Sequence, residues 1–228
     1  KSMQMANFIS DDGILVSNDI SDHRLKAVIR NIEKFGLRNV VVLNESPEKL
    51  ARTLGPMFTS ILVDAPCSGE GMFKKDSKAV ASWEKYGPEA CSSIQEGIVD
   101  QLEHLAGRGC DIVYSTCTFS EIENEMQIQQ FLWKHSDFAP QAIACPAIDV
   151  ENHLAHIWPH RHEGEGHFIA KLKRHSGKEP LKQPKYASNL PPKEVAEFIS
   201  KHIKGNRFEG HYDIIKEKVY LKPEQQLP

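Results

Sequence analysis

The chain has 228 residues, enough for one α/β domain with an additional segment, and its 40% hydrophobic and 26% charged residues are ordinary for a globular protein. Because the formal net charge is −3, any nucleic-acid contact must come from a local basic face. No apolar run approaches the roughly 20 residues of a membrane span, and the first residues lack the layout of a signal peptide. We therefore expect no membrane partner. Five irregularly spaced cysteines favour free thiols in a reducing cytoplasm over a disulfide framework.

Short apolar runs separated by helical patterns extend over the first 174 residues. They predict buried strands at 14–18, 40–43, 61–63, 111–114 and 167–172. Strands that are apolar on both faces are typical of a parallel sheet covered by helices on both sides. The sequence therefore predicts an α/β fold with a doubly wound, mainly parallel sheet.

The predicted helices begin and end at recognisable residues. Ser21 is a preferred N-cap, and Gly36 suits the position after the last helical residue. Pro88 suits the first turn of a long helix that would extend to about residue 106. Ser120 and Glu123 have the spacing of a capping box, which predicts the start of a further helix there.

The composition changes after residue 174. Residues 175–191 are rich in proline and lysine and are predicted to be a linker. A short amphipathic helix is predicted at 192–203, followed by polar sequence with little order. The predicted organisation is a first domain at 1–174, the linker, and the beginning of a C-terminal extension at 192–228.

Polar residues follow the predicted strands at the edge where doubly wound sheets bind their ligands. An acid after the second strand of such a sheet often accepts hydrogen bonds from ribose hydroxyls, which is a role open to Asp19. Glu45, after the next strand, could bind an adenine amino group. Taken singly, Asp19 and Glu45 could equally be ordinary polar strand ends or helix caps.

Two cysteine-containing segments are more specific. DAPCSGEG places Cys67 just beyond a buried strand, and its glycines would let the backbone approach a ligand closely. STCTF places Cys117 at the end of another strand. Free cysteines are commonly buried as small apolar side chains, but a position just beyond a strand end favours a functional role. Simple burial suits the remaining cysteines, Cys91, Cys110 and Cys145.

In this order, DAPCSGEG and STCTF resemble motifs IV and VI of the Nop/Sun family of RNA cytosine carbon-5 methyltransferases. The segment from Asp19 to Arg24 and the sequence WPHRHEGEGHFIAKLKR at 158–174 match the family too. The sequence beyond residue 174 resembles the start of the extra C-terminal region of its bacterial 16S ribosomal-RNA branch. The resemblance implies a Rossmann-like class I methyltransferase domain at 1–174, S-adenosylmethionine as cofactor, and an RNA-binding type of extension at 192–228.

The resemblance also implies covalent catalysis. Carbon 5 of cytosine is a poor nucleophile, and a thiolate that adds to carbon 6 turns the ring into an enamine-like species that can take a methyl group. The family assigns this addition to Cys117, which must be partly a thiolate to react. It assigns Cys67 to release of the product, and Asp64 to contacts with the cytosine edge and the methionine end of the cofactor. DNA cytosine methyltransferases use the cysteine of Pro-Cys as nucleophile, so the Thr-Cys at Cys117 favours RNA.

The first motif of the family, a glycine-rich loop that ends in Gly-Gly-Lys, is matched only by Lys1. The first strand of the sheet is therefore expected to be missing from this sequence, and we expect residues 1–228 alone to fold and bind cofactor poorly, because a sheet without its central strand has unpaired edges. The predicted cofactor contacts are Lys1, Asp19, Asp64 and either Glu45 or Ser46.

Histidines gather at residues 153–167, with spacings that could bind zinc. Pro159 and the absence of a nearby cysteine pair favour polar loop histidines instead, some of which could touch RNA. We therefore predict no metal site.

Basic and aromatic residues supply candidate RNA contacts. Lys171, Lys173 and Arg174 begin a basic run that could bind phosphates, whereas a solvated linker is the favoured interpretation for 178–185. Residues after DAPCSGEG could hold a flipped-out base or its backbone, namely Phe73, Lys74 and Lys75. The expected partner is RNA, either ribosomal RNA or the small ribosomal subunit, and the expected oligomeric state is a monomer.

A catalytically silent RNA-binding or ribosome-assembly relative with the same fold is the alternative. The presence of both cysteines, Asp64 and Asp19 favours the enzyme.

Overall fold

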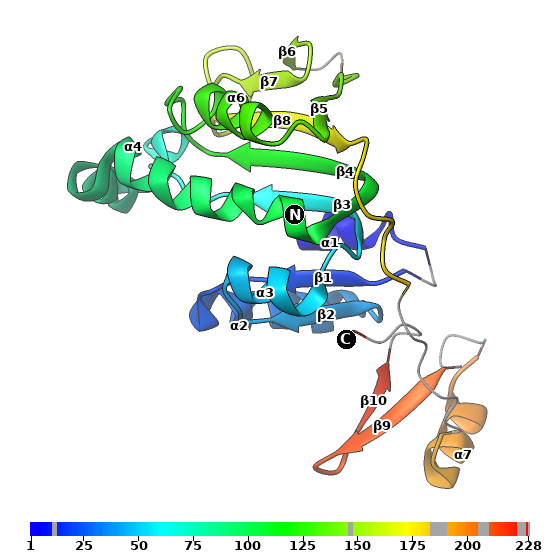
Figure 1. Cartoon of the computed structure of the whole chain (residues 1–228). Coiled ribbons are helices and arrows are strands. Elements are labelled where there is room, and N and C mark those ends of the chain that lie inside the picture. Colours follow the sequence, from blue (N-terminus) through cyan, green and yellow to red (C-terminus); the bar gives the residue numbers. More distant parts are fainter. Residues whose placement is uncertain (11–12, 146–147, 183–190, 205–209, 223–226, 228) are drawn as a thin grey trace. The chain divides into compact units, whose positions relative to one another are not determined.

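The computed structural model describes residues 1–228 apart from 11–12, 146–147, 183–190, 205–209, 223–226 and 228. The chain divides into two compact units (Figure 1): unit 1 comprises Lys1–Ser46 and Lys182–Pro228, and unit 2 comprises Pro47–Leu181. The predicted linker includes residues 183–190, which lie outside the described part, and the predicted domain boundaries stay predictions. No helix among the described residues is long and apolar enough to cross a membrane.

The N-terminal part of unit 1 holds a short parallel sheet and two helices. Its elements are α1 (Ser2–Ala6), β1 (Leu15–Asn18), α2 (Asp22–Phe35) and β2 (Val40–Leu43), and β1 pairs with β2 in parallel from Leu15↔Val40 to Asn18↔Leu43. The Ser21 side chain accepts the N–H of Arg24 at the start of α2, and Gly36 ends the helix in the left-handed conformation. Both strands and both ends of this helix confirm the sequence predictions.

The C-terminal part of unit 1 contains α7 (Lys193–His202), as predicted, and a hairpin that was not predicted. Its strands, β9 (His211–Ile215) and β10 (Lys218–Lys222), pair antiparallel. For residues 211–222 the prediction of little order was wrong, because the turn consists of Lys216 and Glu217, both with positive φ, in place of the glycine or asparagine that normally mark such turns. Tyr212 is buried, and an ion pair of 2.6 Å joins Lys222 Nζ to Asp213 Oδ2.

Unit 2 is built on a six-stranded sheet. In chain order its elements are α3 (Pro47–Leu54), β3 (Phe58–Asp64), the short 3₁₀ helix η1 (Glu70–Met72), α4 (Ser77–Asp100), α5 (Leu102–Leu105), β4 (Ala106–Thr116), α6 (Glu125–Lys134), β5 (Phe138–Pro140), β6 (Asp149–Glu151), β7 (Leu154–Ile157) and β8 (His167–Arg174). The strand order is β3-β4-β8-β7-β6, with β5 also paired to β8. The β3–β4 pair is parallel as expected, whereas β8 runs antiparallel to β4.

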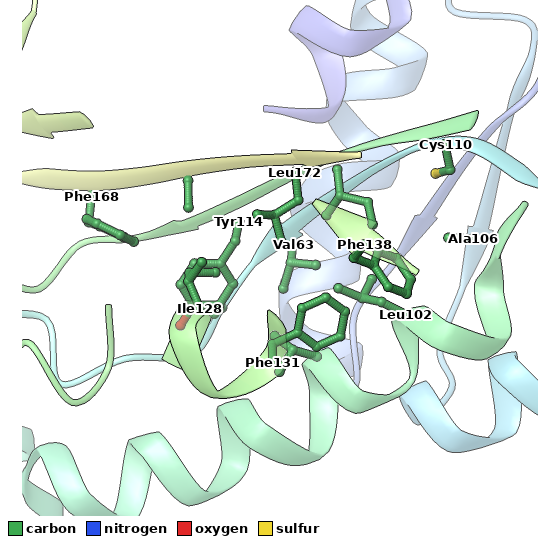
Figure 2. Close-up of a cluster of buried hydrophobic side chains, with 14 residues drawn as sticks. Val63, Leu102, Ala106, Cys110, Tyr114, Ile128, Phe131, Phe138, Phe168 and Leu172 are labelled. Carbon is green, nitrogen blue, oxygen red and sulfur yellow. The ribbon is translucent and has the colours of Figure 1, made fainter. Parts of the chain in front are cut away.

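The core of unit 2 lies between this sheet and the helices α4, α5 and α6 (Figure 2). Alternate residues of β4 and β8 point into it, among them Tyr114 and Phe168, whose rings meet edge-on with centroids 6.3 Å apart. Ile128 and Phe131 of α6 pack against them. The predicted helix start at Pro88 corresponds to a kink inside α4, where Gly87 has non-helical backbone angles. This packing fixes the two strands whose ends carry the cysteine segments.

Candidate active site

The two cysteine segments leave the sheet of unit 2 at the same edge. Asp64, which is exposed, ends β3 directly opposite Ser115 near the end of the parallel strand β4, and the N–H of Ala65 donates to the Ser115 carbonyl at 3.0 Å. Beyond the strands, the N–H of Gly71 donates to the carbonyl of Cys117 at 2.8 Å. The prediction that both cysteines lie at one edge of the sheet is confirmed.

The sulfur atoms of Cys67 and Cys117 are in direct contact. Their Sγ atoms lie 3.1 Å apart, and the backbone N–H of Cys117 donates to Cys67 Sγ at 3.3 Å. Both are free thiols and both are half-buried. The hydrogen bond to Cys117 and then burial raise the pKa of Cys67 far above its usual value. Cys67 is therefore a thiol at neutral pH that shares a hydrogen bond with the sulfur of Cys117, in which either sulfur can be the donor.

Glu123 has a different role from the predicted capping box. The helix α6 begins only at Glu125, and the Glu123 side chain is fully buried beneath the loop that contains Cys67. Its carboxylate accepts the N–H of Ser68 at 2.9 Å, the hydroxyl of Ser68 at 2.5 Å and the amide of Gln95 at 2.9 Å. The capping-box prediction was wrong because a buried carboxylate needs several donors, and this distant loop supplies them.

Asn124, the next residue, makes the corresponding contacts with the segment that contains Cys117. The Thr116 hydroxyl donates to Asn124 Oδ1 at 2.6 Å, and Asn124 Nδ2 donates to the Thr118 carbonyl at 3.0 Å. The two segments are also joined to each other, since the hydroxyls of Ser68 and Thr118 lie 2.8 Å apart. Glu123 and Asn124 were not singled out as site residues from the sequence.

Glu70 and Gly71, which follow Cys67 in the chain, form hydrogen bonds with the segment that contains Cys117. The Glu70 carboxylate accepts the Phe119 N–H at 2.9 Å, the Thr118 hydroxyl at 3.1 Å and the Trp83 indole N–H at 3.1 Å. A Cβ atom on Gly71 would lie 2.5 Å from the Gly166 carbonyl oxygen, so only glycine fits there. The predicted close approach at this glycine is thus one between backbone segments of the protein.

Four of the predicted cofactor residues belong to unit 1. Asp19 follows β1, and its Oδ1 accepts the Ser21 N–H at 2.7 Å and the Arg24 guanidinium at 2.8 Å. The amide of Asn18 donates to the Glu45 carbonyl at 2.9 Å and accepts the Glu45 N–H at 3.0 Å. Because Asn18 and Leu43 are paired at the ends of the parallel strands, Asp19 and Glu45 lie at one edge of the β1–β2 sheet.

The other two predicted cofactor residues lie beside these strands in the chain. Ser46 directly follows Glu45. Lys1 precedes α1, whose first residue, Ser2, lies with its Oγ 3.0 Å from the Oγ of Ser17 in β1. The contact roles predicted for Lys1, Asp19, Glu45 and Ser46 stay predictions.

Comparison with known proteins places this geometry in a family. The model of the 16S rRNA methyltransferase RsmB/F family matches residues 1–173. The chain belongs to this family. It is 34% identical over 220 residues to ribosomal RNA small subunit methyltransferase F of Aeromonas salmonicida, covering 90% of this chain and 46% of that protein. It is 32% identical over 193 residues to the protein of the same name from Serratia proteamaculans, covering 82% and 40%. The chain therefore spans less than half the length of the curated relatives it matches.

The solved structures agree with the RsmB/F assignment. The crystal structure of NSun6 from Pyrococcus horikoshii with SFG matches with a TM-score of 0.66 and 28% identity, covering 77% of this chain and 45% of that one. A methyltransferase homologue from Pyrococcus horikoshii matches in fold, with a TM-score of 0.56 and 24% identity over 72% of this chain and 54% of that one. The predicted Nop/Sun resemblance and the predicted Rossmann-like class I fold are both confirmed.

Among the predicted RNA-contacting residues of this RsmB/F chain, those after η1 lie on the surface or close to it. Lys74 is exposed. Phe73 meets the ring of Trp83 edge-on, with centroids 6.3 Å apart. Lys75 forms an ion pair of 2.9 Å with Glu165. Their predicted contacts with RNA stay predictions.

The basic residues at the end of β8 divide by the side of the strand on which they lie. Lys171 and Lys173 alternate with the buried residues of β8, and Lys173 pairs with Asp111 at 3.3 Å. Arg174 is buried instead, and its guanidinium binds Asp137 at 2.6 Å and the carbonyls of Glu103 and Ala106. The predicted RNA contact of Arg174 is therefore corrected: its donors are used inside the protein to anchor the end of β8.

The histidine-rich segment forms part of an aromatic stack beside the Cys117 segment. The ring of Trp158 stacks on His156 at 4.8 Å and on Phe119 at 5.2 Å, and His156 also pairs with Glu125 at 2.8 Å. Within the described ranges, no group of three or more histidine, cysteine or acidic side chains could hold a metal ion. His156 thus supports the site through packing.

Proposed function

We propose that the protein containing this chain methylates carbon 5 of cytosine in ribosomal RNA, through a covalent bond between Cys117 and carbon 6 of the base. The single observation that carries this proposal is the contact of 3.1 Å between the sulfurs of Cys67 and Cys117 at the end of two neighbouring strands. Membership of the RsmB/F family supports it, since the matched relatives are named as ribosomal RNA small subunit methyltransferases.

Cys117 acts first in the proposed reaction. Its thiolate forms a bond to carbon 6, and the electron pair of the carbon 5–carbon 6 double bond becomes available at carbon 5, which takes the methyl group. A base then removes the proton from carbon 5, the double bond re-forms, and the carbon 6–sulfur bond breaks with its electron pair returning to Cys117 as the thiolate. Formation of the bond requires the sulfur to be held close to carbon 6, since a displacement of about 1 Å can slow such a step by about a hundredfold.

Cys67 acts in the last step. Because its thiol remains protonated and lies against the sulfur of Cys117, it can donate a hydrogen bond to the thiolate that leaves carbon 6. This contact stabilises the leaving group, and so favours release of the methylated RNA. The order of the two cysteines in the chain is the one that the RNA-specific family shows.

The cofactor proposed is S-adenosylmethionine, which supplies the methyl group from its sulfonium. The residues present fit it, because Asp19 and Glu45 lie together at the ends of two parallel strands and carry acceptors for ribose hydroxyls or an amino group. Lys1 and Ser46 lie beside the same strands, and Asp64 ends β3. The structure named NSun6 from Pyrococcus horikoshii with SFG belongs to a matched relative and supports the same class of ligand.

The RNA contacts proposed are those of Phe73, Lys74, Lys75, Lys171 and Lys173. They offer one aromatic ring and four basic side chains, the residue types that stack on bases and bind phosphates. The proposed partner is ribosomal RNA or the small ribosomal subunit, the proposed location is the cytoplasm, and the proposed oligomeric state is a monomer.

The experiment uses the full-length protein that carries this chain, incubated with S-adenosylmethionine and unmodified 16S ribosomal RNA. Cys117→Ala should abolish both methyl transfer and the covalent adduct seen on a denaturing gel. Cys67→Ala should accumulate that adduct, while Cys91→Ala serves as the control. If Cys67→Ala abolished the adduct and Cys117→Ala retained it, the two roles would be reversed. Absence of methyl transfer by the unaltered protein would instead favour an RNA-binding relative without catalysis.

A further inference from the structure

Cys67 is anchored through the residues on both sides of it in the chain. Gln95 Nε2 donates to the carbonyl of Pro66 at 2.8 Å, and the N–H and hydroxyl of Ser68 both donate to the carboxylate of Glu123. The same amide of Gln95 donates to Glu123 at 2.9 Å, so both anchors belong to one connected network. Glu123 therefore helps to hold the backbone on both sides of Cys67, through Ser68 directly and through Gln95.

Cys117 is anchored in the same manner by Asn124. The hydroxyl of Thr116 and the carbonyl of Thr118 are bound by the two ends of one amide group, at 2.6 Å and 3.0 Å. Cys117 lies between these two residues in the chain. Glu123 and Asn124, which are consecutive in the chain, thus each bind residues that flank one of the two cysteines.

The burial of these side chains indicates that their role is geometric. Glu123, Asn124, Gln95 and Thr118 are 0% exposed. Among the described residues the Glu123 carboxylate has no cationic partner, and hydrogen-bond donors alone compensate its loss of solvation. A buried carboxylate and a buried amide cost free energy unless all their bonds are made. Apolar residues would fill this space at lower cost but would leave the two cysteine segments without fixed positions.

We infer that Glu123 and Asn124 are a pair of positioning residues, Glu123 for Cys67 and Asn124 for Cys117. The inference deepens the proposed function and rests on it for the roles of the two cysteines. It assigns the two neighbouring residues to different steps of the reaction, since Cys67 serves release and Cys117 serves bond formation. Disturbing one residue should therefore change one step and leave the other nearly intact.

The first test follows the covalent adduct in the full-length protein under single-turnover conditions. Glu123→Gln, which keeps the size but replaces one acceptor oxygen by a donor, should slow adduct release by about tenfold or more and leave adduct formation nearly unchanged. Asn124→Ala should slow adduct formation by about tenfold or more without accumulation. Glu121→Gln, at an exposed position two residues before Glu123, is the matched control and should behave as the unaltered protein.

A second test reads the two thiols directly and does not depend on the RNA reaction. Alkylation by iodoacetamide, mapped by mass spectrometry, should accelerate severalfold at Cys67 but not at Cys117 in Glu123→Gln. The reverse selectivity is expected in Asn124→Ala. Removal of the Glu123 charge acts in the same direction, because that charge contributes to the raised pKa of Cys67.

Two gentler substitutions separate positioning from loss of folding. Ser68→Ala removes the hydroxyl that donates to Glu123 and that also contacts Thr118. Thr116→Val removes the hydroxyl that donates to Asn124. Each should reproduce the direction of its partner variant with a smaller fall in melting temperature, because the carboxylate or amide keeps its remaining hydrogen bonds. If the paired variants changed both thiols or both steps equally, the inference would be wrong. If alkylation were selective but Cys67→Ala formed no adduct, the positioning would stand and the proposed role of Cys67 would fail.

Discussion

The proposed cysteine centre of unit 2 and the proposed cofactor residues of unit 1 are held by contacts of different kinds. The residues that flank Cys67 are bonded to the fully buried Glu123 and Gln95, up to 55 residues away in the chain. Those that flank Cys117 are bonded to the fully buried Asn124, six and eight residues away. The carboxylate of Asp19 is one quarter exposed and accepts hydrogen bonds from Ser21 and Arg24, two and five residues away. Formation of a covalent bond is slowed about a hundredfold by a displacement of about 1 Å, whereas a hydrogen bond to a ligand tolerates local adjustment. Fully buried contacts supply the first requirement, and partly exposed contacts suffice for the second.

This contrast predicts that the largest losses follow from buried, long-range contacts in unit 2, and Arg174 tests it most strongly. Arg174→Leu should lower the free energy of unfolding by about 3–5 kcal/mol, because it leaves Asp137 and two backbone carbonyls without their partner. Lys173→Leu, at the neighbouring position on the other side of β8, removes an ion pair that is nearly half exposed and should cost about 1 kcal/mol or less. Urea unfolding of both variants measures the difference, and equal costs would contradict the buried role.

Gly71 provides the next largest effect, on activity more than on stability. In Gly71→Ala the added Cβ would lie 2.5 Å from the Gly166 carbonyl oxygen and 2.9 Å from that of Cys117, so the loop must move. Methyl transfer should fall by about a hundredfold, as expected when reacting groups are displaced by about 1 Å. Gly97→Ala in α4 is the control: nothing lies within 4 Å of its Cβ, and the exchange should stabilise the helix by up to about 1 kcal/mol. Normal methyl transfer by Gly71→Ala would show that the loop position is not critical.

Asp19 tests the exposed side of the comparison. Asp19→Ala should weaken S-adenosylmethionine binding by about tenfold, because one charge-assisted hydrogen bond to the ligand is lost. The melting temperature should change little, since the Asp19–Arg24 pair is exposed at the arginine. Asp22→Ala, in the first turn of α2, is the matched control and should bind cofactor normally. Calorimetric titration of the full-length protein distinguishes the two; equal affinities would remove Asp19 from the proposed cofactor site.

The same distinction explains which features the sequence could predict. β1, β2 and the ends of α2 follow from continuous apolar runs and from the caps Ser21 and Gly36, whose signals are local. The role of Glu123 was missed because a capping box is also a local signal, and here the buried contact with Ser68 overrides it. The two cysteines were found because strand ends of a parallel sheet meet at one edge, which requires no knowledge of the side-chain packing.

Arg174 was misassigned although the sequence contains the signal that identifies it. Every second residue of β8 is buried, namely Phe168, Ala170 and Leu172, and Arg174 is the next residue in this alternation. A period of two residues therefore predicts that Arg174 points inward, whereas counting basic residues predicts a phosphate contact. In the β9–β10 hairpin, by contrast, the turn at Lys216 and Glu217 lacks the residues from which such turns are recognised.

Lys75 and Glu165 sharpen the comparison with its smallest expected effect, because they form an exposed pair within unit 2. The bond to Lys75 lowers the pKa of Glu165, so the pair is intact at neutral pH and is lost as the pH falls through that lowered pKa. Glu165→Gln should release Lys75 toward phosphates and raise RNA affinity by about twofold at neutral pH, an effect that should shrink on acidification. Filter binding at fixed salt measures it, with Glu163→Gln as the control. A large loss of stability would mean that even exposed contacts in unit 2 determine its geometry, and that exposure alone does not separate the two kinds of site.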